Sequence, residues 1–138
     1  MFNIRKHALV FAAVTTMAFC GATAAQATDD ECLDGGCAAI AANNAGSYYA
    51  DNNGNGYDTM EKARFAARKG CQKKLPNGGT CTYDKSVAEN IKYSFSAGIC
   101  SGEIFLGASI ADYSGSDTVV RQKARDAGML PCRIFAHR

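Results

Sequence analysis

Residues 62–71 read KARFAARKGC, and the same ten-residue pattern recurs at residues 123–132 as KARDAGMLPC. Five of the ten aligned positions are identical, and both copies end in a cysteine. An earlier cysteine precedes each copy at a similar distance, Cys37 before Cys71 and Cys100 before Cys132. The pattern predicts one duplicated domain over residues 37–138, with repeats at about 37–84 and 91–136.

The first repeat is expected to contain two strands followed by a helix. The apolar run at 37–42 predicts a buried strand, and the turn residues after it predict a second strand at 47–50. Asp58 stands where a helix N-cap is expected, with an acidic residue three positions later. Gly70 is a plausible stop for this helix.

The second repeat predicts the same order of elements. Strict alternation over 91–96 indicates a half-buried strand, and 103–108 forms the next one. We expect a turn at 113–116, a helix capped by Asp117 and a last strand at 132–135. The predicted class is therefore α+β, with two repeated strand-strand-helix units sharing a mostly antiparallel sheet, stapled by disulfide bonds.

The first 27 residues have the features of a secretory signal peptide. Arg5 and Lys6 precede a 13-residue apolar run at 8–20, and residues 25–27 supply the small residues of a cleavage site. This run is too short to span a bilayer, which needs about 20 apolar residues. We therefore expect a periplasmic or secreted protein with no membrane anchor after cleavage.

The charge of the chain beyond the signal is balanced. Two of its 15 basic residues lie in the signal, which leaves 13 basic and 13 acidic residues in 28–138. Nucleic-acid binding is disfavoured because phosphate contacts need an excess of basic residues. Residues 28–36 form an acidic arm. The basic residues of 62–74 are either a solvated helix face or a partner-binding patch, and the candidates are Lys62, Arg64, Arg68, Lys69, Lys73 and Lys74.

Six cysteines remain after the signal, an even number typical of an exported disulfide scaffold. None has the CxxC spacing of a zinc site, and the single histidine beyond the signal, His137, lies next to the end of the chain. Among the fifteen possible connectivities we favour Cys71 with Cys81 and Cys100 with Cys132. The six predicted disulfide residues are Cys32, Cys37, Cys71, Cys81, Cys100 and Cys132.

Residues 51–62 share part of the pattern of a calcium-binding EF-hand loop. Oxygen-bearing side chains fall at the first, third and fifth positions, but Lys62 stands where that loop needs a glutamate. An Asn/Gly-rich turn before a capped helix accounts for the same residues without a metal. If calcium binds, its candidate ligands are Asp51, Asn53, Asn55 and Asp58.

The order of these elements resembles a family of small secreted bacterial proteins known as domain of unknown function 4189. The resemblance is carried by residues 38–41, the alanine-rich helix ending at Cys71, the segment 81–83 and Cys100, and it covers about residues 37–136. It implies a strand at 81–83 and a secreted, in some members virulence-linked, protein without an established activity. Cys32 is extra relative to the family pattern.

The expected function is that of a binding protein. No phosphate loop, nucleophile elbow or metalloprotease motif is present, so no catalytic residue and no cofactor are predicted. We expect an exported, non-catalytic protein that contacts a protein or cell-envelope partner. The alternatives are a secreted effector acting on host cells and a small hydrolase or inhibitor of a cell-wall hydrolase.

Overall fold

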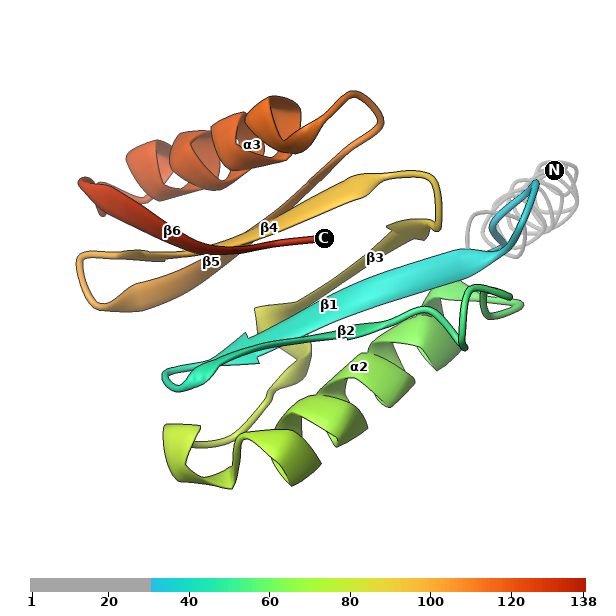
Figure 1. Ribbon diagram of the computed structural model, residues 1–138. Helices are drawn as coiled ribbons and strands as arrows, with labels where there is room; N and C mark the ends of the chain where they lie inside the picture. Colours follow the sequence, from blue (N-terminus) through green and yellow to red (C-terminus); the bar gives the residue numbers. More distant parts are fainter. Residues whose placement is uncertain (1–30) are drawn as a thin grey trace, which may run out of the picture. The chain divides into compact units, whose positions relative to one another are not determined.

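The computed structural model describes residues 31–138, so the predicted signal peptide and the start of the acidic arm lie outside the described residues. The described part is an α+β fold with two antiparallel sheets (Figure 1). The first sheet has the order β2-β1-β3 and the second has the order β5-β4-β6. The predicted single shared sheet is therefore wrong, because each half builds a three-stranded sheet of its own.

Each half carries one long helix between its second and third strands. The first half contains β1 (Cys37–Asn43), β2 (Gly46–Ala50), α2 (Met60–Lys74), the short helical turns η1 (Pro76–Gly78) and η2 (Tyr83–Lys85), and β3 (Ser86–Asn90). The second half contains β4 (Ser94–Cys100), β5 (Glu103–Ser109), α3 (Tyr113–Asp126) and β6 (Cys132–His137).

Strand β1 is buried on both faces and lies at the centre of the molecule. Side chains of a strand alternate between its faces, so Ala39 and Ala41 pack against α2. Ala38, Ile40 and Ala42 face the second sheet. Their small volume allows α2 to approach β1 closely, since the helix presents Ala63 and Ala67 at the contact, both fully buried.

The two sheets stack face to face, and the helices cover their outer faces (Figure 1). Contacts between the sheets join β1 to β4, β3 to β5 and β2 to β6. Phe95, Ala97 and Leu106 supply the second sheet's share of the buried layer between them. Helix α3 closes the far side through Val120 and Ala124. The result is a helix, sheet, sheet and helix in four layers.

Both helices begin at a different residue from the predicted cap. Thr59 caps α2 by accepting a hydrogen bond from the Lys62 amide at 3.2 Å. Asp112 caps α3 by accepting one from the Gly115 amide at 3.0 Å, so residues 113–116 are helical rather than a turn. Asp58 and Asp117 are instead engaged by other side chains.

The strand predicted at 91–96 begins three residues later, at Ser94. Asn90 ends β3 and forms a turn, because its side chain accepts a hydrogen bond from the Lys92 amide at 2.9 Å and its carbonyl accepts one from Tyr93. In the segment 81–83, where the family resemblance implies a strand, Cys81 and Thr82 lie in a loop and Tyr83 begins η2. The strand that follows α2 is β3.

The disulfide bonds Cys71–Cys81 and Cys100–Cys132 are present, which confirms both predicted pairs. The third bond joins Cys32 to Cys37. Cys71 lies inside α2, whereas Cys132 opens β6. The two cysteines that align in the repeated pattern therefore occupy different structural positions, although both sheets order their strands alike.

Gly70 does not end α2, which continues to Lys74. The ring of Tyr48 lies directly over Gly70, in the space that a Cβ atom would need. We expect Gly70→Ala to lower the free energy of unfolding by about 1–3 kcal/mol, because a side chain here overlaps the ring. Urea denaturation of this variant measures the loss. Lys69→Ala, at an exposed position of the same helix, serves as the control and is expected to change stability by less than about 0.5 kcal/mol.

Candidate functional site

The predicted basic cluster lies along α2 and divides into two groups. Lys69, Lys73 and Lys74 are exposed on the helix, and the ammonium of Lys69 lies 5.7 Å from the centre of the Phe65 ring. Arg64 and Arg68 are half-buried and turn toward the loop after the helix. Lys62 stands apart because its ammonium is bound by Asp58 at 2.6 Å.

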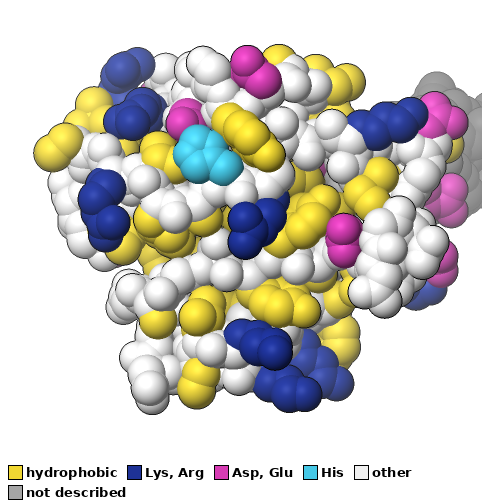
Figure 2. All heavy atoms as spheres, viewed as in Figure 1, with side chains coloured by type: hydrophobic (Ala, Val, Ile, Leu, Met, Phe, Trp, Pro, Cys, Tyr) yellow, Lys and Arg dark blue, Asp and Glu magenta, His cyan; other side chains and the backbone are white. Residues whose placement is uncertain are grey.

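Phe65 is a large apolar side chain on the solvent side of α2, and 58% of its surface is exposed. It lies between two shallow depressions of about 440 and 500 Å³. Figure 2 shows Lys and Arg side chains gathered at the bottom of the view, where α2 lies in Figure 1. We call this surface the α2 face; it comprises Tyr57, Glu61, Lys62, Phe65, Ala66, Arg68, Lys69, Gln72 and Lys73.

Two arginines of the cluster are held in place by an aromatic ring. The guanidinium carbons of Arg64 and Arg68 lie 4.5 and 5.1 Å from the centre of the Tyr83 ring. Cation–π attraction of this kind stabilises by about 0.5–1 kcal/mol at exposed sites. The Nε atom of Arg68 is buried and has no hydrogen-bond partner among the described residues. The two guanidinium groups are thus ordered beside the α2 face.

The positive charge of this cluster is mostly uncompensated. Among the ion pairs of residues 31–138, only the pair with Asp58 involves one of the six predicted basic residues. The hydrogen bond that Lys62 donates to Asp58 lowers the pKa of the Asp58 carboxyl, and the positive charge of Lys62 lowers it further. The described end of the acidic arm forms a backbone bridge from Glu31 to Thr59, at the start of the helix.

The four candidate calcium ligands lie in a loop organised by its own hydrogen bonds. The Gly56 amide donates to the Asp51 carbonyl at 2.9 Å, and the Asn55 side chain donates to the Asn52 carbonyl at 3.2 Å. The carboxylate of Asp58 is bound by Lys62. Within residues 31–138, no group of three or more His, Cys, Asp or Glu side chains is arranged to hold a metal ion. Asp51 and Asn55 thus take part in the hydrogen bonds of the turn, whereas Asp58 pairs with the first turn of α2.

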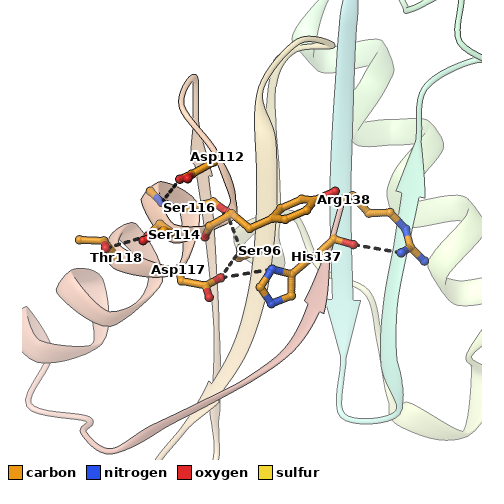
Figure 3. Close-up of polar contacts among 10 residues, drawn as sticks. Ser96, Asp112, Ser114, Ser116, Asp117, Thr118, His137 and Arg138 are labelled. Atoms are coloured by element: carbon orange, nitrogen blue, oxygen red, sulfur yellow. Dashed lines mark hydrogen bonds and ion pairs between the residues drawn. The ribbon is translucent and has the colours of Figure 1, made fainter.

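A second polar cluster, which the sequence pattern did not indicate, joins β4, α3 and β6 (Figure 3). The Ser96 hydroxyl contacts the Asp117 carboxylate at 2.5 Å and the Ser116 hydroxyl at 2.6 Å. Nδ1 of His137 lies 3.7 Å from the same carboxylate. The ring of Tyr113 meets His137 edge-on, with 5.1 Å between centroids. The alternation over 91–96 places Ser96 opposite Phe95, on the face that a half-buried strand exposes, so its burial under α3 was not expected.

Serine, aspartate and histidine lie together here in an order that differs from a hydrolase triad. A triad needs the histidine between the serine nucleophile and the carboxylate. Here Ser96 binds the carboxylate directly, and its side chain is fully buried. This geometry lets the cluster tie a buried strand to the helix above it, and it does not present a serine to a substrate.

No family model, curated protein or solved structure matches the chain. The resemblance to domain of unknown function 4189 therefore stays a prediction. Neither described helix is both long and apolar enough to cross a membrane.

Proposed function

We propose that this protein is an exported, non-catalytic binding protein whose α2 face docks onto an acidic surface of a protein partner in the periplasm or outside the cell. The observation that carries the proposal is Phe65, an exposed aromatic side chain surrounded by basic residues. An aromatic anchor inside a charged rim is the usual composition of an interface hot spot.

Export is supported by the three disulfide bonds within one small domain. Such bonds form and persist in oxidising compartments and are rare in the cytosol. The predicted signal peptide leads to the same compartment. The balanced charge of residues 28–138 and the family resemblance agree with a small secreted protein, and either the periplasm or the medium fits them.

An acidic partner is supported by the charges around Phe65. Lys69 lies over its ring, and Arg68 and Lys73 line the depression beside it, whereas Glu61 is the single acidic residue that lines the two depressions. Complementary charges speed the encounter and select the partner, while the aromatic anchor supplies affinity. No cofactor enters the proposal, and nucleic acid is disfavoured by the neutral charge of the mature chain.

In both sheets the first strand of the half lies between the second and the third, and this shared order supports an origin by duplication, followed by divergence. Ala63 of α2 and Ala124 of α3 align in the repeated pattern, and both are fully buried. In the proposal the first half has kept the binding role. The second half carries the Ser96, Asp117 and His137 cluster, which joins its strands to α3.

Charge reversal on the α2 face tests the electrostatic part of this proposal. We expect Lys69→Glu with Lys73→Glu to weaken capture of the partner from envelope extract roughly tenfold, and salt to weaken capture by the unmodified protein. Reversal at Lys92 and Arg125, which are exposed elsewhere, changes the net charge equally and is expected to leave capture intact. Equal loss in both double variants would show that net charge alone governs binding and would contradict a role of the α2 face.

A further inference from the structure

A cavity of about 450 Å³ opens on the side of the molecule where β3 lies beside β5. Both halves contribute to it: Arg64 comes from α2 and Lys123 from α3. The loop that carries Tyr83 forms one wall. This cavity, which we call the inter-half cleft, is distinct from the two depressions around Phe65.

The floor of the inter-half cleft is apolar. Val87 from β3 and Ile104 and Leu106 from β5 line it. Ile104 and Leu106 are buried, and both belong to the core between the two sheets. A ligand in the cleft therefore meets a largely buried apolar surface together with three cationic side chains and one carboxylate, that of Asp84. Apolar linings with a few polar groups are typical of small-molecule sites.

Two of the three cations that line the cleft have no acidic partner within residues 31–138. Lys123 donates a hydrogen bond to the Leu106 carbonyl at 2.9 Å, and Arg64 lies over the Tyr83 ring. Neither is among the ion pairs of residues 31–138. A third cation, Lys85, is already shared between Asp84 and Glu103, at 3.9 and 3.5 Å. Among the described residues that line the cleft, Arg64 and Lys123 are thus the two cations without an ion-pair partner.

The charges of Arg64 and Glu89 both act on Lys123, although Lys123 forms no ion pair within residues 31–138. Partial burial lowers the pKa of its ammonium, and the charge of Arg64 lowers it further. The carboxylate of Glu89 acts in the opposite direction on Lys123, and burial raises the pKa of Glu89 itself. A bound anion between the two cations would relieve their repulsion, with Glu89 as an opposing charge.

We propose that the inter-half cleft binds a small organic anion, with its phosphate or carboxylate group held by Arg64 and Lys123 and its apolar body on Val87, Ile104 and Leu106. A guanidinium group binds either anion through two parallel hydrogen bonds. The inference stands apart from the proposed docking of the α2 face, because it concerns a different surface and a small ligand.

Titration followed by nuclear magnetic resonance tests the cleft, with phenyl phosphate and benzoate as the two probes. We expect saturable shifts at residues 85–87 and 104–106 with at least one probe, and weaker binding of inorganic phosphate and of phenol. The probe that binds identifies the preferred head group. The absence of saturable shifts with both probes at millimolar concentration would overturn the proposal.

Substitutions assign the binding to the two cations. We expect Arg64→Gln and Lys123→Gln each to weaken probe binding roughly tenfold, which corresponds to the loss of a charge-assisted hydrogen bond. Glu89→Gln removes the opposing charge and is expected to tighten binding, a gain that unfolding cannot produce. Lys74→Gln removes one charge from the exposed end of α2 and is expected to have no effect. Unchanged affinity in Arg64→Gln and Lys123→Gln would refute the assignment.

Discussion

Replacing Phe95 with alanine is expected to lower the free energy of unfolding by about 3–5 kcal/mol. Phe95 heads the fully buried side chains in volume, and it lies in the layer between the two sheets. Its ring centre is 5.6 Å from that of Tyr49, which lies on strand β2 of the first sheet. Truncation removes this contact and leaves a cavity that the rigid sheets on either side cannot fill.

Urea denaturation followed by circular dichroism measures this effect. Phe105→Ala is the matched control, because Phe105 lies on the same strand pair, in register with Gly98, and is only half-buried beside α3. The free energy of unfolding is expected to fall by less in Phe105→Ala than in Phe95→Ala. If Phe95→Ala lowered the free energy of unfolding by less than Phe105→Ala does, the main core would not lie between the two sheets.

Replacing Cys100 and Cys132 with alanine removes their disulfide. From the entropy of its loop, we expect this change to lower the free energy of unfolding by about 4 kcal/mol. The bond spans 32 residues and encloses β5 and α3, so its absence frees most of the second half in the unfolded chain. The oxidised double variant is compared with the unmodified protein by thermal and urea unfolding.

The other two disulfides provide an internal scale for this prediction. The bonds Cys71–Cys81 and Cys32–Cys37 span 10 and 5 residues. Loop entropy predicts losses of about 3 and about 2 kcal/mol for their removal. A larger loss for the Cys32–Cys37 pair than for the Cys100–Cys132 pair would mean that native contacts, rather than loop entropy, set the stabilisation.

The strands could be predicted largely because their patterns are local. The apolar run at 37–42 and the turn after it gave β1 and β2 within one residue, and the cysteine spacing gave two of the three disulfides. The start of α2 was misplaced by one residue because adjacent residues competed for the cap, and that of α3 by five residues because its first turn, 113–116, has the composition of a turn. Thr59 caps α2 while its neighbour Asp58 pairs with Lys62.

The separation into two sheets could not be predicted, because it depends on which faces meet. The sequence marks β1 as buried, and a strand buried on both faces fits either a shared sheet or a sheet covered by a second one. The choice is made by long-range packing of Ile40 against the layer that holds Phe95 and Leu106. No local pattern records that contact.

The basic residues of the α2 face were predicted, whereas Phe65 was not. Ala63, Ala67 and Cys71 are spaced by four residues and form the buried stripe of α2. Phe65 lies two positions from Ala63, and that offset turns it toward solvent. The helical periodicity therefore contained the signal, although an aromatic residue among alanines is more often part of a core. The inter-half cleft needed the structure, because its two cations lie 59 residues apart in the chain.

The affinity of the Phe65→Ala variant for the captured partner tests the docking proposal most directly. The oxidised protein is immobilised, the protein it retains from envelope extract is purified, and binding is then measured for the unmodified chain, Phe65→Ala and Ile110→Ala. Ile110 is 72% exposed and lies in the loop between β5 and α3, so it controls for loss of exposed apolar surface. We predict that Phe65→Ala weakens binding by about 2 kcal/mol or more, whereas Ile110→Ala binds normally. Unchanged affinity in a folded Phe65→Ala variant would contradict the account.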